Sequence, residues 1–366
     1  MRGHGGVTLI GVTTPEPPEY PLVEDLSALG ADARGLQTAF AVVRRVRRGE
    51  TRAGKPYFEL SLADRTRTVA AKVWSDAGRA MAVAEHLRPG THVKILFETD
   101  EYQGKLQLSV RNVRPVEPKE PGYDPTKLVD EGFDLVSDIL FDTVVFDIET
   151  VPATDLRKAP PTIAQAVTKY ADRQEWDESK VMSLSPYFGQ VVSLAVGDGD
   201  APLDEQPVTV FVVPPPDMEL GELPEWMRPV SEADLLRAFW ALAGNASVVV
   251  SYNGRGFDVP FLVGRSLIHD VPVRVDLQGN RYAMRPHCDL FQALGGRGRG
   301  PSSLDVVCWA LGLSSPKEDM DGSMVATYYA KGDVARIAEY NAGDVRATTA
   351  VYQKVRDGVL RYRSDW

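Results

Sequence analysis

The sequence predicts two folded parts, a small all-β barrel followed by an α/β domain with a mixed central sheet and flanking helices. Residues 35–117 contain five short runs in which apolar and polar side chains alternate, as in half-buried strands. Beyond residue 142, apolar Val-rich runs alternate with amphipathic stretches, as in an α/β domain. A length of 366 residues also suits two domains of ordinary size.

The N-terminal residues 1–34 are expected to be a flexible leader. They contain the proline-rich run Thr14–Pro21, which can form neither a helix nor a central strand because proline lacks a backbone N–H donor. Residues 118–141 begin in a second proline-rich, charged stretch and are expected to be a linker. The predicted domains are therefore residues 35–117 and residues 142–366.

The order of elements predicts the type of barrel. A helical stretch, Ser75–His86, lies between the third and fourth strand-like runs. A five-stranded barrel with a helix at this place fits an OB fold. The segment Gly54–Phe58 also resembles the OB domains that precede some bacterial 3′-to-5′ exonucleases, as do Lys72–Trp74 and Gly104–Leu108. The five runs are Thr38–Arg48, Tyr57–Leu62, Thr68–Trp74, His92–Phe97 and Lys105–Arg114.

Alternation predicts which side chains of the second and third runs face outward. Successive side chains of a strand point to opposite faces, so Tyr57, Lys72 and Trp74 share the outer face. OB domains stack single-stranded bases on such a face. An exposed tyrosine or tryptophan can instead pack on a neighbouring domain, and this alternative stays open. The inward set is Phe58, Leu60, Leu62, Val69, Ala71 and Val73.

Charge is distributed unevenly along the chain. Residues 36–114 hold 15 Lys and Arg against 8 Asp and Glu, a balance of +7, whereas the whole chain carries −10. A basic barrel can attract a phosphate backbone, and Arg44 and Lys105 are candidates for such contacts. A basic surface that is simply well solvated gives the same count.

The first catalytic candidates follow a predicted central strand. Thr143–Ile148 is an apolar run rich in β-branched residues, as expected for a strand covered on both faces. Asp147 and Glu149 are two positions apart, so their side chains leave the strand on one face. Two acids at the end of an apolar strand are costly unless a cation neutralises them.

Two later segments bring further polar side chains. Asp258 follows the Val-rich run Ser247–Ser251 and an Asn-Gly turn at Asn253, so we expect it at a strand-to-helix junction. Tyr340 and Asp344 are four positions apart in a helical-looking stretch and therefore lie one turn apart on one face. We expect these side chains to join the two strand acids in one cluster. Asn253 is a further candidate for contact with nucleic acid.

The segment Pro152–Tyr187 is long for a connection within a sheet. It is expected to contain a helix near Ile163–Asp172 and could shape a substrate channel.

A cluster of carboxylates suits two hard divalent cations, Mg²⁺ or Mn²⁺. Two such ions, about 3.5 to 4 Å apart, can activate a water and stabilise the leaving oxygen of a displacement at phosphorus. By geometry we expect Asp147 to bridge both ions, Glu149 and Asp344 to hold the ion that binds the attacking water, and Asp258 to hold the second. Tyr340, which is too weak an acid to be a strong base, would orient the water through its hydroxyl.

Each segment alone also has an ordinary structural explanation. Asp-x-Glu at a strand end is common on protein surfaces, and the Asn-Gly pair can be only a turn. Asp258 can be a helix N-cap, and Tyr340 and Asp344 can be an apolar contact beside a solvated charge. All three segments occur in the right order and context, and this conjunction favours the metal cluster.

Together the three segments resemble the DEDDy-type 3′-to-5′ exonucleases of the RNase H-like superfamily, relatives of the family B DNA polymerase proofreading domain. The family's motifs correspond to Phe146–Thr150, Tyr252–Phe261 and Glu339–Val345, and the tyrosine at position 340 assigns the "y" subclass. Further likeness runs through His287–Leu290. The resemblance implies an RNase H-like exonuclease fold and release of nucleoside 5′-monophosphates from a 3′ end.

Composition argues against several other classes. Two cysteines cannot build a disulfide framework and suit a reducing compartment, and five isolated histidines give no zinc spacing. No apolar run approaches the roughly 20 residues that span a bilayer, and Met1–Tyr20 contains no apolar stretch typical of a signal peptide. We therefore expect a cytoplasmic protein with no membrane partner.

Two hypotheses for function follow. The first is a metal-dependent 3′-to-5′ exonuclease whose OB domain holds single-stranded nucleic acid and feeds its 3′ end to the carboxylates. DNA is favoured over RNA because the motifs resemble those of a polymerase. The second is a non-catalytic single-strand binding or recruiting protein built on a nuclease fold. The intact acids and tyrosine favour the enzyme.

Overall fold

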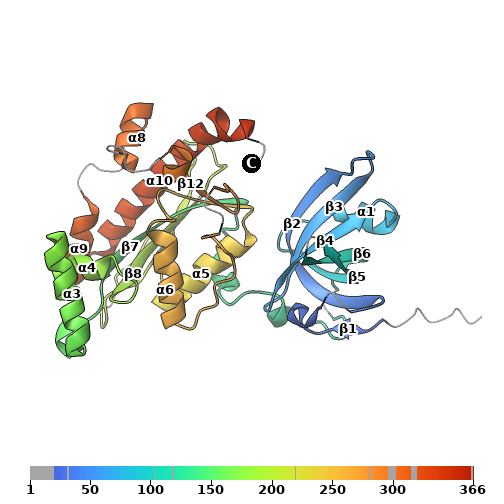
Figure 1. Cartoon of the computed structure of the whole chain (residues 1–366), viewed down its shortest axis with the longest axis horizontal. Helices are drawn as coiled ribbons and strands as arrows, with labels where there is room; N and C mark the ends of the chain where they lie inside the picture. Colours follow the sequence, from blue (N-terminus) through green and yellow to red (C-terminus); the bar gives the residue numbers. More distant parts are fainter. Residues whose placement is uncertain are drawn as a thin grey trace, which may run out of the picture. The chain divides into compact units, whose positions relative to one another are not determined.

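The computed structural model divides the chain into two compact units, with the main boundary between Leu128 and Val129. Figure 1 shows the helices and strands of both units. The structure describes residues 20–30, 33–102, 104–117, 119–218, 220–279, 282–295, 302–314, 320–363 and 366. Residues 1–19, 31 and 32 of the expected leader lie outside this set.

The N-terminal unit contains a closed five-stranded barrel. The long strand β2 (Gln37–Glu50) pairs first with β5 and then with β3, which closes the order β2-β3-β4-β6-β5. β4 and β6 run parallel, and the helix α1 lies between β4 and β5 in the chain. This arrangement confirms the predicted OB fold. The remaining bounds are β3 Pro56–Ala63, β4 Thr68–Trp74, α1 Gly78–Ala84, β5 His92–Tyr102 and β6 Lys105–Pro115.

The barrel core contains the inward set that alternation predicts. All six side chains are buried, with exposed fractions of 6% or less. α1 covers one end of this core with Ala80 and Ala84. The strand periodicity of the sequence therefore places the core of this unit correctly.

Part of the expected leader belongs to the barrel. β1 (Leu22–Val23) pairs in parallel with β2, and Leu26, in the short helix η1 (Leu26–Ala28), lies in the barrel core. The Asp64 carboxylate accepts a hydrogen bond of 2.6 Å from the Leu26 backbone N–H. The expectation of a flexible segment does not hold for residues 20–30, because Leu26 and Leu29 are buried against the barrel.

The segment expected to be a linker is also packed. Leu128, after the short helix η2 (Pro125–Lys127), is buried in the first unit. Val136, in α2 (Phe133–Val136), lies in the core of the second unit. Proline-rich composition predicted an open chain here, but these apolar side chains fix the segment at both ends.

The C-terminal unit is built on a six-stranded mixed sheet with the order β10-β9-β8-β7-β11-β12. β7 (Thr143–Pro152) is central, antiparallel to β8 and parallel to β11. The two apolar runs Thr143–Ile148 and Ser247–Ser251 therefore lie in neighbouring strands, β7 and β11. The other strands are β8 Gly189–Asp198, β9 Val208–Val212, β10 Met227–Pro229, β11 Val248–Ser251 and β12 His287–Asp289.

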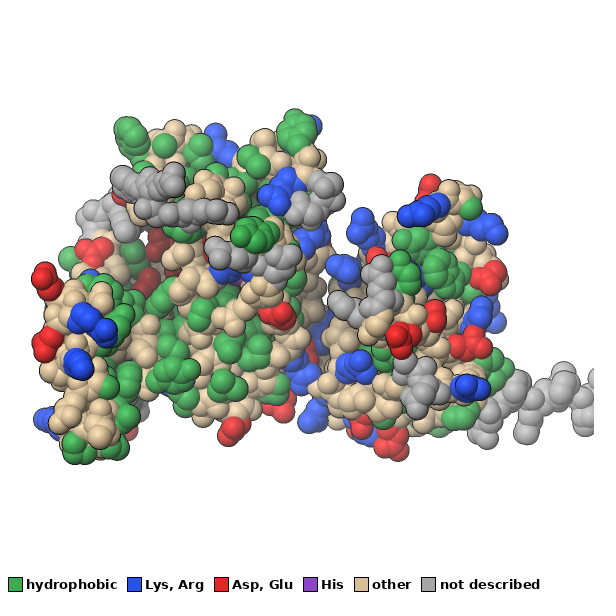
Figure 2. All heavy atoms as spheres, viewed as in Figure 1, with side chains coloured by type: hydrophobic (Ala, Val, Ile, Leu, Met, Phe, Trp, Pro, Cys, Tyr) green, Lys and Arg blue, Asp and Glu red, His purple; other side chains and the backbone are tan. Residues whose placement is uncertain are grey.

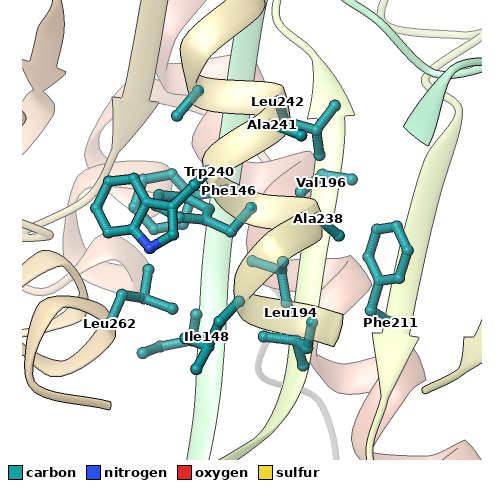
Figure 3. Packing of buried hydrophobic residues seen from close by; sticks show 14 of the residues in the cluster. Phe146, Ile148, Leu194, Val196, Phe211, Ala238, Trp240, Ala241, Leu242 and Leu262 are labelled. Atoms are coloured by element: carbon teal, nitrogen blue, oxygen red, sulfur yellow. The ribbon is translucent and has the colours of Figure 1, made fainter. Parts of the chain in front are cut away.

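Helices cover both faces of this sheet. α5 (Glu232–Asn245) packs on one face, where Phe146 and Trp240 lie among buried aliphatic side chains (Figure 3). α10 (Val334–Gly358) packs on the other face through Ala338, Ala342 and Val345. The predicted mixed sheet with flanking helices is therefore confirmed.

The remaining helices lie in the connections. They are η3 Leu156–Lys158, α3 Pro161–Gln174, α4 Glu178–Ser183, α6 Asp258–Ile268, α7 Leu290–Ala293, α8 Leu304–Leu311, η4 Gly322–Met324, α9 Val325–Ala330 and η5 Leu360–Tyr362. α3 confirms the helix expected near Ile163–Asp172. Among the described residues, no helix combines the length and the apolar character needed to cross a membrane.

A buried ion pair ties the helices to the sheet. Glu232 accepts hydrogen bonds from Arg265 Nε at 2.8 Å and from the Val191 backbone N–H at 2.8 Å. Arg265 also donates to the backbone oxygen of Pro186 at 3.1 Å. This pair joins α5, α6, β8 and the chain that precedes β8, so removing either partner would leave an uncompensated buried charge.

Glu120 generates a prediction about acid stability. Its carboxylate accepts hydrogen bonds from Arg114 and lies 2.9 Å from Lys94 Nζ, and the Arg114 bonds lower the pKa of Glu120 from 4.5 to about 2. The folded state binds this proton less readily than the unfolded state, so the stabilisation is complete above pH 4.5. It is lost as the pH falls toward 2.

We therefore expect Glu120→Gln to lower the free energy of unfolding of the N-terminal unit at pH 7 by about 1 to 3 kcal/mol. Calorimetric scans of both proteins should converge between pH 4.5 and 2. Glu101→Gln, which changes an exposed carboxylate of β5, is the matched control. A pH-independent difference would contradict the assignment.

Candidate active site and nucleic-acid interface

Strand β7 places two carboxylates on one face. Val145 packs against α10, while Phe146 and Ile148 point into the core beneath α5. Asp147 and Glu149 therefore share the α10 side with Val145, as the period of two predicts. Both side chains are only partly buried. A bulge between Glu149 and Thr150 then shifts the register of the pairing with β8, which continues to Pro152.

Helix α10 brings Tyr340 and Asp344 to these acids. Carboxylate oxygens of Asp147, Glu149 and Asp344 lie within 4.8 Å of one another. Tyr340 hydrogen-bonds to the Asp344 side chain and lies close enough for Glu149 and Asp147 to act on its hydroxyl. Four of the five expected catalytic side chains are thus gathered where α10 crosses β7.

Asp258 lies beside this group rather than inside it. It begins α6, is 5% exposed and exerts the strongest charge effect on Asp147. Backbone N–H groups of Asp258 itself and of Ile148 hydrogen-bond to its carboxylate. The structure therefore places this carboxylate next to β7, at the strand-to-helix junction that the sequence predicts.

Proximity and burial change the proton affinity of these groups. Burial, followed by the charges of Asp258, Asp344 and Glu149, raises the pKa of Asp147 well above its ordinary value. Burial likewise raises the pKa of Asp258 to about 7. The pKa of Tyr340 is raised by burial and by Asp344, so its hydroxyl stays protonated at neutral pH.

The donor set fits a divalent cation. Every side chain of the cluster offers oxygen, which is the ligand that Mg²⁺ and Mn²⁺ prefer. The raised pKa values reflect carboxylates that repel one another in a partly dry site, and a cation placed among them would remove that repulsion. Asp147, Glu149 and Asp344 could hold one ion, and Asp258 could hold a second together with Asp147.

Asp289 organises the loop that leads to Asp258, and its role was not predicted. Its carboxylate accepts hydrogen bonds from the backbone N–H groups of Asn253 at 3.0 Å and Arg255 at 3.1 Å, and it caps α7. Asn253 adopts a left-handed backbone with φ of 60°. The sequence signal was the likeness of His287–Leu290 to the exonuclease family, which did not reveal the contact because the contact is long-range.

His287 is a structural residue. Its Nδ1 lies 2.9 Å from the Leu277 backbone oxygen and its Nε2 lies 2.7 Å from Ser251 Oγ. Burial lowers the pKa of His287 to about 4, so the ring is neutral at pH 7. It then donates to Leu277 and accepts from Ser251, and neither nitrogen is left for a metal or a substrate.

An aromatic and basic group forms on the outer face of the barrel. Tyr57 and Trp74 are cross-strand partners with ring centroids 5.3 Å apart. Lys72 Nζ lies 5.5 Å from the Tyr57 ring and 5.2 Å from the Trp74 ring. We call Tyr57, Lys72, Trp74 and Tyr102 the barrel aromatic face. Tyr102 was missed because β5 extends five residues beyond its predicted end, through a polar hairpin.

A glycine lets Tyr57 lie flat against the barrel. Gly49 pairs with Tyr57 across β2 and β3, and a Cβ atom at position 49 would lie 2.7 Å from the tyrosine ring. Arg47, Arg48 and Glu59 line a pocket of about 240 Å³ beside this ring. The aromatic face therefore adjoins exposed cationic side chains on β2, and Figure 2 shows basic side chains on the visible surface of this unit.

The other expected contacts with nucleic acid have different outcomes. Arg44 is only 4% exposed, so the prediction that it meets phosphates is wrong. Arg44 lies at the β2 bulge between Val43 and Arg45, where its side chain is covered by the protein. Asn253 is exposed near Asp258. The Lys105 side chain lies outside the described part of the chain.

A comparison with protein families matches residues 216–361 to the family described as "Predicted 3'-5' exonuclease related to the exonuclease domain of PolB". The matched range contains Asp258, Tyr340 and Asp344. It begins after Asp147 and Glu149, which the structure brings close to Asp344.

Two curated proteins are similar to part of the chain. The 3'-5' exoribonuclease YhaM of Bacillus subtilis (strain 168) is 33% identical over 81 residues, which are 22% of this chain and 25% of that protein. YhaM of Geobacillus sp. (strain WCH70) is 32% identical over 75 residues, or 20% of this chain and 22% of that protein. The chain thus spans about a quarter of the length of the relatives it matches.

Two solved structures align with this chain at low TM-scores. A family B DNA polymerase from Pyrobaculum calidifontis aligns with 87% of this chain and 46% of its own at 16% identity and a TM-score of 0.40. The OB domain of Ta0387 from Thermoplasma acidophilum aligns with 28% of this chain and 92% of its own at 16% identity and a TM-score of 0.22.

The carboxylate cluster predicts a stability crossover. Without divalent cations, Asp147→Asn should raise the melting temperature, because it removes one carboxylate from a group of acids that repel one another. With excess Mn²⁺ the wild-type protein should gain about 3 kcal/mol at 100 times the dissociation constant, while the variant gains little. Differential scanning fluorimetry with and without EDTA measures both effects.

Asp204→Asn, which changes an exposed acid far along the chain from the cluster, should respond to Mn²⁺ like the wild-type protein. An equal Mn²⁺ response in Asp147→Asn would show that these carboxylates do not hold the cation.

Proposed function

We propose that this chain, whose C-terminal unit is a 3′–5′ exonuclease domain related to that of PolB, hydrolyses single-stranded nucleic acid from its 3′ end. The observation that carries the proposal is the convergence of Asp147, Glu149 and Asp344 with Tyr340, beside Asp258. In the proposed reaction a water attacks the terminal phosphorus and the bond to the 3′ oxygen of the preceding nucleotide breaks. The products are a nucleoside 5′-monophosphate and a strand with a new 3′-hydroxyl.

The position of each residue in the site suggests its role in the reaction. Two bound divalent ions would supply the charge that activates the water and stabilises the leaving oxygen. Asp147 would contact both ions, Glu149 and Asp344 one of them, and Asp258 the other. Tyr340 keeps its proton at neutral pH, so its hydroxyl orients the attacking water rather than serving as a base.

The barrel would hold the strand. Its aromatic face presents Tyr57, Trp74 and Tyr102 around the Lys72 ammonium, which suits stacked bases with a phosphate between them. Stacking tolerates any base, because every base has a π face. A holding site of this kind would raise the affinity for long strands without taking part in hydrolysis.

Two comparisons bear on whether the substrate is DNA or RNA, and they favour different answers. The matched family is related to a DNA polymerase domain, which agrees with the preference for DNA expected from the motifs. The curated relatives are named exoribonucleases. Digestion of matched DNA and RNA oligonucleotides, each 5′-labelled, separates the two substrates by kcat/KM.

Hydrolysis should depend on the cluster. We expect Asp147→Ala and Asp344→Ala each to lower kcat by roughly 1,000-fold or more, since each loses part of a cation site worth several kcal/mol. Tyr340→Phe should lose roughly 100-fold, because it keeps the ring and removes the orienting hydroxyl. The measurement is the stepwise shortening of 5′-labelled single strands in Mg²⁺ or Mn²⁺.

The Asp204→Asn protein is the control for these assays, and circular dichroism checks the fold of each variant. Full activity in Asp147→Ala would refute the proposed site. Tight strand binding with no metal-stimulated cleavage in the wild-type protein would instead support the non-catalytic binding protein.

The barrel should matter for long substrates only. Trp74→Ala and Tyr57→Ala should each weaken binding of a long single strand by about 1 to 3 kcal/mol, the usual worth of one stacked base. Tyr57→Phe retains the ring and should bind normally. Dinucleotide hydrolysis should be unchanged in all three, and an equal loss on dinucleotides and long strands would contradict the holding role.

A further inference from the structure

The segment between β7 and β8 encloses an apolar pocket of about 330 Å³ inside the C-terminal unit. α3 and α4 form its walls, and Val167 and Val181 form a buried floor. Tyr170 and Trp176 stand at the rim with exposed fractions of 42% and 37%. Ser185 is the only lining residue with an aliphatic hydroxyl. The full lining is Ala166, Val167, Tyr170, Trp176, Val181, Leu184, Ser185 and Phe188.

This pocket is connected to the carboxylate cluster by a short path. Thr150, the neighbour of Glu149, donates a hydrogen bond of 2.7 Å from its hydroxyl to the Ser183 backbone oxygen. Leu184 and Ser185, which line the pocket, follow directly. With 3.8 Å between consecutive Cα atoms, the pocket wall lies within roughly 15 Å of Glu149. That span is within reach of the last few nucleotides of a bound strand.

The pocket is held open by hydrogen bonds and packing. The backbone oxygen of Pro186 accepts from Arg265 at 3.1 Å, and the backbone oxygen of Phe188 accepts from Ala153 at 2.9 Å. Pro186 also packs where α6 has glycine, since a Cβ at Gly264 would lie 2.6 Å from it. A ligand would therefore meet a preformed site and would not have to order it.

The rim pairs aromatic rings with cations. Lys180 Nζ lies 4.5 Å from the Trp176 ring centroid, and the Arg173 guanidinium lies 5.3 Å from the Tyr170 ring. Both cations are exposed, and Figure 2 shows charged side chains interspersed with apolar ones over this segment. Aromatic surface beside a cation suits a ligand that has a flat ring and an attached anion.

We infer that this pocket, bounded by Tyr170 and Trp176, binds one nucleobase of the substrate strand upstream of the cleaved bond. The inference rests on the proposed function and names a subsite of it. A nucleobase supplies the flat ring, and its flanking phosphates meet Lys180 and Arg173. The lining offers few hydrogen-bonding groups, so the subsite accepts any base, as an enzyme that removes successive nucleotides requires.

Two variants and a matched control test the subsite in the full-length protein. Trp176→Ala and Tyr170→Ala each remove one rim ring, and Tyr170→Phe retains it. Trp309→Ala removes a tryptophan of α8 that is 82% exposed and lies outside the pocket lining. Circular dichroism establishes that each protein is folded, and Tyr170→Ala stands in if Trp176→Ala does not fold.

The substrates are single-stranded oligonucleotides in which one base is removed to leave an abasic sugar, at each position from the 3′ end in turn. For the wild-type protein we expect one position upstream of the cleaved bond where loss of the base lowers kcat/KM roughly 5- to 100-fold. The Trp176→Ala protein should show the same loss of kcat/KM on the intact strand. Removing the base at that position should then cause no further loss. Trp309→Ala should behave like the wild-type protein.

Binding without catalysis gives a second readout. In EDTA, 2-aminopurine placed at that same position should be quenched on binding to the wild-type protein and should fluoresce in Trp176→Ala and Tyr170→Ala. If both rim variants lost as much kcat/KM at the abasic position as the wild-type protein does, the subsite would be overturned. The proposed exonuclease function would be unaffected by that result. Wild-type protein that neither binds nor cleaves a strand would overturn the proposed function, and the subsite with it.

Discussion

The arrangement of the C-terminal unit depends on keeping like charges close together. Asp147, Glu149 and Asp344 approach within 4.8 Å, and Asp258 adds a further negative charge beside them. On a flexible backbone these carboxylates would move apart, because their mutual repulsion and their desolvation both disfavour the close arrangement. Its geometry therefore has to be imposed by the scaffold, and the buried core of the sheet and its helices supplies that restraint.

The restraint comes from elements that have little freedom to yield. β7 is hydrogen-bonded on both edges, and α10 is packed on it through small side chains such as Ala338 and Ala342, which permit a close approach. Asp289 fixes the turn before α6 by accepting hydrogen bonds from the backbone of Asn253 and Arg255. The stability that the acids cost locally is offset by apolar burial elsewhere, so the unit can retain a site that is strained until cations neutralise it.

Much of this could be predicted from local patterns. Asp147 and Glu149 share a face because strands have a period of two, and Tyr340 and Asp344 meet because helices place residues four apart on one face. Both rules act within one element, and both held. The barrel core followed for the same reason, since Phe58, Leu60 and Leu62 alternate with polar neighbours.

The errors arose where long-range contacts override local patterns. Arg44 alternates correctly for an outward side chain, but it lies at the β2 bulge, where other parts of the fold bury it. Tyr102 lies in a polar run that becomes strand only because β6 pairs with it. The α3–α4 pocket depends on Pro186 and Phe188 being held by distant partners, and no spacing in the sequence reports such contacts.

The order of the site along the chain has a consequence for its synthesis. Asp147 and Glu149 leave the ribosome early, whereas α10, with Tyr340 and Asp344, follows most of the C-terminal unit. A growing chain that lacks α10 has an unfinished set of acids and an uncovered sheet face. The cluster is therefore incomplete until α10 has left the ribosome, because Asp344 completes the group of carboxylates that begins on β7.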